Sequence, residues 1–253
     1  MSALEPTTGY AVVDGARLYY QIHGTGDPIV LLHGGVLTIE LSFAAILPAL
    51  AAGRQVIAIE LRGHGRSEDT EREFSIPDFA AGVIGVLDHL GLERADFFGF
   101  SLGGLTSLQI AVAHPERVKR LILGSTQYRQ DGYYDEISDP AMTSPRLPTV
   151  DDFAAMREAY VQVAPDPDHF EAFMAKVGPA VHAFTGWSDQ QLQAIAAPTL
   201  LVIGDSDFVR PEHALQMQSL IPDAQLAILP GTSHVGVTQR AEVLVPMLER
   251  FLG

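Results

Sequence analysis

Residues 97–104 read Phe-Phe-Gly-Phe-Ser-Leu-Gly-Gly, and the pattern Gly-x-Ser-x-Gly lies at 99–103. The preceding residues are apolar, as in a buried strand, whereas residues 104–113 have helical spacing. Glycines allow a sharp turn between the two elements, which leaves the Ser101 hydroxyl exposed above a sheet and close to a helix N-terminus. We therefore interpret Ser101 as a nucleophile; the plainer alternative is a glycine-rich turn with an inert serine.

Apolar runs elsewhere in the chain predict further strands, because runs without a polar face are typical of a parallel sheet buried on both sides. They lie at residues 29–32, 56–59, 97–100, 121–123, 200–203 and 226–229. Segments with helical spacing separate them, at about 40–52, 77–90, 103–114, 211–220 and 239–251. This alternation predicts an α/β fold with a mostly parallel sheet and helices on both faces. The Asp-Gly pair at 14–15 predicts an N-terminal β-hairpin.

The interval from about 125 to 190 interrupts this alternation. It contains six prolines and two helix-like patches, near 150–163 and 167–177. We interpret it as a small helical lid inserted over the carboxyl edge of the sheet, so that residues 1–253 form a single domain. Large apolar side chains are frequent in the lid; some should line a pocket, but at helical spacing most would hold the lid to the core. They are Tyr128, Tyr133, Tyr134, Phe153, Met156, Tyr160, Phe170, Phe173, Met174, Phe184 and Trp187.

A serine nucleophile needs a base, because its hydroxyl is weakly nucleophilic at neutral pH. His234 is our candidate, since it follows the last predicted strand and precedes the C-terminal helical segment, which brings it to the same sheet edge as Ser101. The base in turn needs a carboxylate that fixes its tautomer. Asp205 and Asp207 both follow the run at 200–203. We favour Asp207, which lies further into the loop, and expect Asp205 to bind loop amides.

The sequence His33-Gly34-Gly35 follows the strand predicted at 29–32. A backbone N–H of this loop could stabilise a developing oxyanion together with the N–H of Leu102. Gly35 is our choice for the first donor, and Val36 is the alternative. We expect His33 to be a structural hydrogen-bonding residue.

Composition limits the partners and the compartment. The net charge of −15 makes nucleic acid and anionic membranes improbable partners. The chain has no cysteine, which excludes disulfides and thiolate metal sites and is typical of a reducing compartment. Residues 1–10 lack the features of a secretory signal. We therefore expect a cytoplasmic protein that acts on a small molecule; its oligomeric state does not follow from the sequence.

These motifs together resemble the α/β-hydrolase family. The resemblance covers nearly the whole chain and includes the Gly-Phe-Ser-Leu-Gly-Gly at 99–104, the Gly-Asp-Ser-Asp at 204–207 and the Gly-Thr-Ser-His at 231–234. One departure is Glu60, where similar proteins have Asp in a structural loop. The resemblance implies an eight-stranded, mostly parallel sheet, no cofactor or metal, and a triad of Ser101, Asp207 and His234.

The expected activity is hydrolysis of a carboxylic ester or lactone through an acyl-enzyme on Ser101. A serine at this position argues against the dehalogenases and epoxide hydrolases of the family, which use aspartate there. Hydrolysis of a C–C bond and cofactor-free haloperoxidase or perhydrolase chemistry remain alternatives on the same triad. A ligand receptor built on the hydrolase scaffold is a third alternative, which filled triad positions disfavour.

Overall fold

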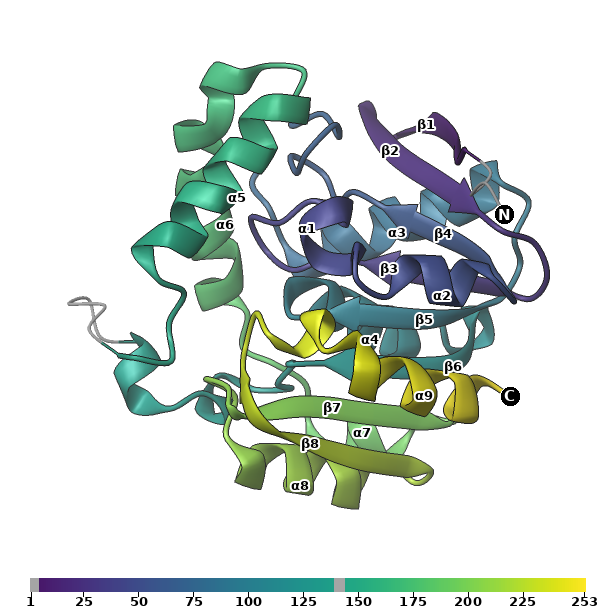
Figure 1. Cartoon of the computed structure of the whole chain (residues 1–253), viewed down its shortest axis with the longest axis vertical. Helices are drawn as coiled ribbons and strands as arrows, with labels where there is room; N and C mark the ends of the chain where they lie inside the picture. Colours follow the sequence, from purple (N-terminus) through teal and green to yellow (C-terminus); the bar gives the residue numbers. More distant parts are fainter. Residues whose placement is uncertain (1–4, 139–143) are drawn as a thin grey trace.

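The computed structural model describes residues 5–138 and 144–253, and in these ranges eight strands form one sheet (Figure 1). The strand order is β1-β2-β4-β3-β5-β6-β7-β8. β1 and β2 form the predicted hairpin, β2 pairs with β4 in the antiparallel sense, and the other pairs are parallel. The strands are β1 (Thr7–Val13), β2 (Ala16–His23), β3 (Pro28–Leu32), β4 (Gln55–Ile59), β5 (Ala95–Phe100), β6 (Val118–Gly124), β7 (Thr199–Ser206) and β8 (Ala224–Ser233).

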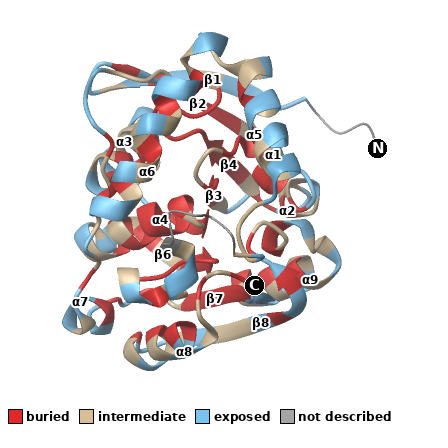
Figure 2. Ribbon diagram, turned by 90° about the vertical axis from the view of Figure 1, so that its left-hand side faces the viewer, coloured by how far each residue is buried: buried red, intermediate tan, exposed pale blue. Residues whose placement is uncertain are grey.

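Helices cover both faces of this sheet, as predicted. They are α1 (Ile39–Phe43), α2 (Leu47–Ala51), α3 (Ile76–His89), α4 (Leu102–Ala113), α5 (Val150–Val163), α6 (Phe170–Ala183), α7 (Asp189–Gln193), α8 (Pro211–Leu220) and α9 (Ala241–Leu252). Figure 2 shows the buried strands between two helical layers whose outer surfaces are exposed. No helix within the described ranges is long and apolar enough to cross a membrane.

Two hydrophobic cores result from the alternation of side chains along the strands. In β5, Phe97 packs into the core that also holds buried side chains of α3, α4 and α8, whereas Phe98 faces the core under α1, α2 and α9. Both phenylalanines are completely buried. The apolar runs of the central strands therefore lack a polar face because these strands face a core on both sides. The run at 226–229 is an exception, because it lies in the edge strand β8 and Ile228 is exposed.

Two helical predictions were wrong in detail. The segment predicted as one helix over 40–52 forms two short helices, α1 and α2, and Pro48 lies in the first turn of α2. A proline is tolerated there because the first helical amides have no intrahelical acceptor. The patch predicted at 167–177 begins as a single 3₁₀ turn at 167–169 and continues as α6 to Ala183, through Pro179.

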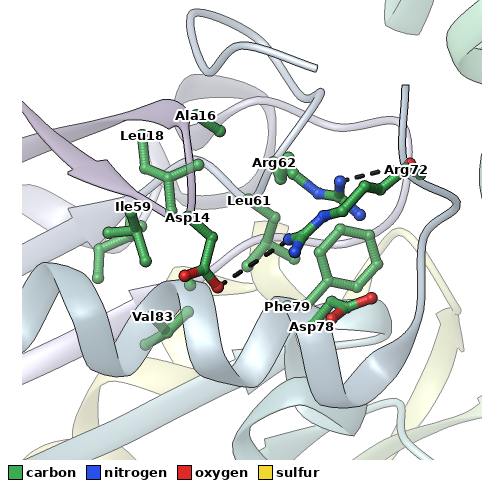
Figure 3. A pocket seen from close by; sticks show the side chains of 12 residues that line it. Asp14, Ala16, Leu18, Ile59, Leu61, Arg62, Arg72, Asp78, Phe79 and Val83 are labelled. Atoms are coloured by element: carbon green, nitrogen blue, oxygen red, sulfur yellow. Dashed lines mark hydrogen bonds and ion pairs between the residues drawn. The ribbon is translucent and has the colours of Figure 1, made fainter. Parts of the chain in front are cut away.

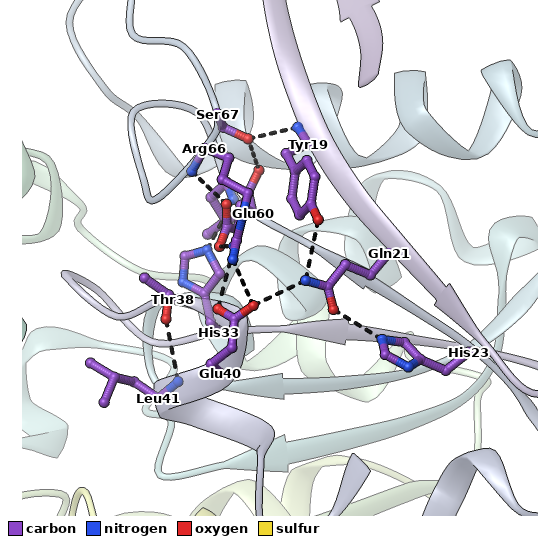
Figure 4. A network of polar contacts seen from close by, with 11 residues as sticks. Tyr19, Gln21, His23, His33, Thr38, Glu40, Leu41, Glu60, Arg66 and Ser67 are labelled. Carbon is purple, nitrogen blue, oxygen red and sulfur yellow. Dashed lines mark hydrogen bonds and ion pairs between the residues drawn. The ribbon is translucent and has the colours of Figure 1, made fainter. Parts of the chain in front are cut away.

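A buried ionic cluster joins α1 to the loop that follows β4 (Figure 4). The Glu60 carboxylate has no exposed surface, accepts a 2.7 Å bond from Nη1 of Arg66 and also accepts the Arg66 backbone N–H. Nη2 of Arg66 donates to Glu40 of α1 at 2.8 Å. Burial raises the pKa of Glu60 to about 7, although the Arg66 guanidinium opposes the shift. The glutamate found in place of the family's aspartate thus belongs to a structural network, as expected.

The raised pKa of Glu60 predicts a pH-dependent stability. Between the unfolded value of 4.5 and the folded value of about 7, the folded chain binds more protons than the unfolded chain. The free energy of unfolding should therefore fall as pH rises through this window, by up to roughly 3 kcal/mol. Glu60→Gln removes this titration, so denaturant unfolding at about pH 5 and about pH 8 should show wild type losing stability relative to the variant.

The comparison between the two proteins isolates Glu60, because every other titrating group is present in both. A difference in unfolding free energy that stays constant with pH would show that Arg66 keeps Glu60 ionised throughout.

Candidate active site

Ser101 lies at the turn between β5 and α4 with φ 52° and ψ −114°. This is a sparsely populated conformation for a residue with a Cβ and costs about 1–3 kcal/mol. Two backbone bonds hold it: the Ser101 N–H donates to Gly124 O at 2.8 Å, and the Leu105 N–H donates to Ser101 O at 2.9 Å. The turn places the Ser101 side chain at the carboxyl end of β5.

Glycine is required on both sides of this turn by close backbone contacts. A Cβ on Gly99 would collide with the carbonyl oxygen of Gly103, and a Cβ on Gly103 would collide with the carbonyl oxygen of Leu32. The Gly-x-Ser-x-Gly spacing therefore reflects how tightly α4 packs on β5 and on the neighbouring β3.

His234 lies within hydrogen-bonding distance of both predicted partners. Its Nε2 is 2.9 Å from Ser101 Oγ, and its Nδ1 is 2.7 Å from Asp207 Oδ1. Strand β8 extends to Ser233, so His234 is the first residue beyond the strand. The imidazole stacks on the Phe208 ring, with centroids 3.6 Å apart and planes inclined by 21°. The structure thus brings together the three residues predicted as a triad.

The Asp207 carboxylate is completely buried but has several donors around it. The Ser125 hydroxyl donates to Oδ2 at 2.5 Å, and the Val209 N–H donates to Oδ1 at 3.1 Å. Burial opposes ionisation of Asp207, but the neighbouring His234 and these hydrogen bonds outweigh it and lower its pKa. At neutral pH the carboxylate is therefore ionised and accepts a hydrogen bond from the N–H at Nδ1 of His234.

Sequence reasoning missed Ser125. It immediately follows β6, whose neighbours in the sheet are β5 and β7, and has a left-handed φ of 51°. A signal was present, because the residue after β6 must lie between the ends of the strands that carry Ser101 and Asp207. The sequence gives no indication, however, that its hydroxyl points toward Asp207.

Asp205 has the other role expected for it. Its carboxylate accepts hydrogen bonds from the backbone N–H groups of Gly231 at 2.9 Å and Thr232 at 3.1 Å. These bonds lower its pKa and fix the end of β8 just before His234. The two aspartates therefore have different partners: Asp205 accepts hydrogen bonds from the loop backbone, and Asp207 accepts one from the His234 imidazole.

The loop after β3 faces Ser101 from the other side. A Cβ on Gly35 would lie 3.7 Å from Cβ of Leu102, so the two predicted amide donors are close neighbours. Among the described residues, neither amide has a hydrogen-bond acceptor. Val36 has a φ of 66°, and the Leu37 N–H closes the turn on Gly34 O at 3.2 Å. Both Gly35 and the alternative, Val36, border the cavity beside Ser101.

His33 lies inside the protein, without exposed surface, and its Nε2 accepts the Leu61 N–H at 3.0 Å. Nδ1 must then carry the proton, which it donates to Gly34 O at 2.8 Å. Burial lowers the pKa of His33 to about 4, so the ring is neutral at physiological pH. Its contacts are those of a residue that ties the β3 loop to the loop after β4.

A cavity of about 190 Å³ adjoins the hydroxyl of Ser101, and its walls are largely apolar. Within the described residues, no Lys, Arg, Asp or Glu lines it, and Tyr133 is among its lining residues. Of the large apolar residues noted in the interval 125–190, Tyr133, Phe153 and Met156 line this cavity. Tyr160 and Phe173 stack on each other instead, within the core that α6 shares with α3 and α4.

A second, small cavity lies between the hairpin and α3 (Figure 3). Its volume is about 10 Å³, which is roughly the space for one water molecule. Arg72 lies 4.0 Å from Asp14 beside it, and Nη1 of Arg62 donates to the Arg72 carbonyl. Arg72 is paired with Asp14, the guanidinium of Arg62 donates to neighbouring oxygens, and the space is too small for an organic substrate, so the candidate site is the cavity at Ser101.

Comparison with known proteins agrees with the fold. The family model of the alpha/beta hydrolase fold matches residues 27–191. The chain is 30% identical to 2-hydroxy-6-oxo-2,4-heptadienoate hydrolase of Pseudomonas putida over 251 residues, which cover 90% of each protein. The chain therefore belongs to the α/β-hydrolase family, and it is a hydrolase.

Solved structures extend this comparison. The enol-lactonase from Burkholderia xenovorans LB400 superposes with a TM-score of 0.78 at 26% identity, covering 96% of this chain and 99% of that one. The meta-cleavage product hydrolase from Pseudomonas fluorescens IP01 superposes with a TM-score of 0.83 over 96% and 97%. Its identity is 20%, so this second similarity concerns the fold alone. Lactone and C–C bond hydrolases thus share this architecture.

The contacts at the turn predict that Gly99→Ala disrupts the protein. The new Cβ would meet backbone atoms of α4, which have no room to move, and we expect a loss of about 3 kcal/mol or more in the free energy of unfolding. Gly178→Ala in α6 is the matched control, because a Cβ there meets no atom within 4 Å. In thermal or urea unfolding the control should equal or exceed wild type, and equal effects of the two substitutions would contradict our explanation.

Proposed function

We propose that the protein is a serine hydrolase that cleaves a neutral carboxylic ester or lactone through an acyl-enzyme on Ser101. The observation that carries the proposal is the chain of contacts from Ser101 Oγ to His234 Nε2, at 2.9 Å, and from His234 Nδ1 to Asp207 Oδ1, at 2.7 Å. Ser101 and His234 also line a largely apolar cavity.

In this mechanism the Ser101 oxygen attacks the substrate carbonyl while its proton passes to Nε2 of His234. Asp207 holds the imidazole in the required tautomer and stabilises the imidazolium. The backbone amides of Gly35 and Leu102 donate to the oxyanion. His234 then protonates the leaving oxygen, the alcohol departs, and a water activated by the same imidazole hydrolyses the acyl-enzyme. Ser125 supports these steps by holding the second oxygen of Asp207.

The cavity favours an uncharged acyl group of moderate size. A volume of about 190 Å³ is somewhat larger than the roughly 150 Å³ of an engineered cavity that accommodates benzene. Leu105, Phe153 and Val181 are among its apolar lining residues. An aliphatic chain or a small ring would bury apolar surface against these residues, whereas an ionised group would lose its hydration without a counter-charge.

Hydrolysis of a C–C bond is the second candidate, favoured by the 30% identity to the heptadienoate hydrolase. A dienoate carries a carboxylate, and a site for it would need a cation. No Lys or Arg lines the cavity in the described part of the chain. Arg146 is engaged elsewhere, because its Nη1 donates to the Asp207 carbonyl and its guanidinium lies over the Tyr134 ring. The cavity therefore supports the ester or lactone assignment better.

The segment with α5 and α6 has the placement of a lid in this proposal. These helices stand beside the end of the sheet, at the left of Figure 1, and α5 contributes Phe153 and Met156 to the cavity. The segment is also fastened to the rest of the domain: Nζ of Lys176 in α6 donates to both Asp69 oxygens at 2.8 Å and to Thr70 O. We assign it the role of covering the acyl group and excluding water.

The division between the two aspartates predicts unequal effects of removing their charges. Asp207→Asn should lower the turnover of a p-nitrophenyl ester by about 10³–10⁴, because an amide supports the wrong tautomer of His234. Asp205→Asn should have a far smaller effect, because Asp205 bonds the loop backbone and not His234, and the single amide oxygen can still accept one of the two N–H groups of Gly231 and Thr232. Steady-state kinetics of both variants tests this, and the reverse ranking would move the acid to Asp205.

The uncharged cavity predicts discrimination between two acyl groups of the same length. We expect kcat/KM for p-nitrophenyl hexanoate to exceed that for the mono-p-nitrophenyl ester of adipic acid by about 100-fold, because the terminal carboxylate of the latter has no counter-charge. Ser101→Ala should reduce turnover of the hexanoate ester by about 10⁴–10⁶. Preference for the adipate ester, or C–C cleavage of a dienoate faster than any ester hydrolysis, would favour the second candidate.

A further inference from the structure

A second hollow adjoins the cavity at Ser101 and is not used by the mechanism above. Its volume is about 420 Å³, and it lies between α1, α5 and the segment that follows His234. Three residues, Leu37, Met156 and Val235, line both spaces and form the partition between them. We call the cavity at Ser101 the inner chamber and this hollow the outer groove.

We propose that the outer groove binds the leaving group of the substrate and selects neutral or cationic alcohols over anionic ones. This inference rests on the proposed ester hydrolysis and deepens it. It assigns the acyl group to the inner chamber and the alcohol to the groove.

The positions of the proton donor and the amides determine this orientation. In acyl transfer the carbonyl oxygen points to the oxyanion donors, and the leaving oxygen points to the histidine that protonates it. Gly35 and Leu102 line the inner chamber and not the groove. Val235, directly after His234, lines both spaces, and Gly236 lines the groove. An alcohol leaving from the side of His234 therefore lies at the boundary between the inner chamber and the groove.

Two carboxylates give the groove its charge. Glu40 of α1 and Asp152 of α5 line it, and no Lys or Arg does so within the described residues. Burial opposes ionisation of Glu40, but hydrogen bonds from Arg66 outweigh it and lower its pKa. Arg66 divides its guanidinium between Glu40 and the buried Glu60, so it compensates the two carboxylates only in part.

The Asp152 carboxylate has fewer hydrogen-bond donors around it than the Glu40 carboxylate. Its Oδ2 accepts from the Thr149 N–H at 2.8 Å and from the Thr149 hydroxyl at 2.7 Å, which caps α5. No described residue donates to Oδ1, which leaves that oxygen for a donor or a cation on the alcohol. An anionic alcohol in the groove would be repelled by both carboxylates.

The test uses a matched pair of substitutions on α5. Ala155 lines the groove, whereas the adjacent Ala154 does not, and both are exposed. Ala155→Lys therefore adds a cation to the groove, and Ala154→Lys adds the same charge to the same helix outside it. The substrates are butanoyl esters of 3-hydroxybenzamide, 3-hydroxybenzoate and 3-hydroxyphenyltrimethylammonium, with each kcat/KM divided by the hydroxide-catalysed rate.

Wild type should hydrolyse the cationic ester about fivefold or more faster than the anionic ester at low ionic strength, after this correction. Ala155→Lys should reduce that preference by about fivefold, and Ala154→Lys should change it by less than about twofold. The preference should shrink in about 0.5 M salt, because exposed charges are screened. Asp152→Asn, which keeps an oxygen to accept from Thr149, should act in the same direction as Ala155→Lys.

The outcomes separate this inference from the function on which it rests. If wild type hydrolyses all three esters without discrimination, or if the two lysine variants behave alike, the groove does not bind the leaving group and the ester assignment stands. If wild type hydrolyses none of them, the proposed function falls and the inference falls with it.

Discussion

The buried carboxylate of Asp207 is the constraint on which the site depends. It has no exposed surface, so its charge must be balanced by donors inside the protein. Those donors come from separate parts of the chain: Ser125 after β6, the Val209 amide in its own loop and His234 after β8. This fold satisfies the carboxylate because it brings the carboxyl ends of neighbouring parallel strands to one edge.

The same edge explains why strain is tolerated at two serines. Ser101 and Ser125 both have left-handed φ values, and each follows a strand in the middle of the sheet. The Ser101 N–H donates to Gly124 O, and the Ser125 N–H donates to Val202 O, each at 2.8 Å. These bonds continue the ladder for one residue beyond the strands, so the sheet itself fixes both turns and the direction of both hydroxyls.

The sequence allowed much of the fold and the triad to be predicted because their signals are local. The Asp-Gly turn, the strands without a polar face and the glycines around Ser101 each follow from steric requirements within a few residues. The break between α1 and α2 could not be predicted in this way. A proline such as Pro48 occurs in the first turn of a helix as well as in segments that are not helical. The Ser125 contact joins residues 82 positions apart and depends on strand order, which no local pattern contains.

Substrate specificity cannot be predicted from local sequence patterns either, because it also depends on how distant segments pack together. The inner chamber and the outer groove are both formed where α5 approaches the loops after β3 and β8, and the partition consists of one residue from each: Met156, Leu37 and Val235. A change in the placement of α5 would alter both spaces at once without affecting the contacts of Ser101, His234 and Asp207. One hydrolase scaffold can therefore serve lactones, esters and C–C bonds, because its chemistry is fixed by the sheet edge and its substrate by the helices set against that edge.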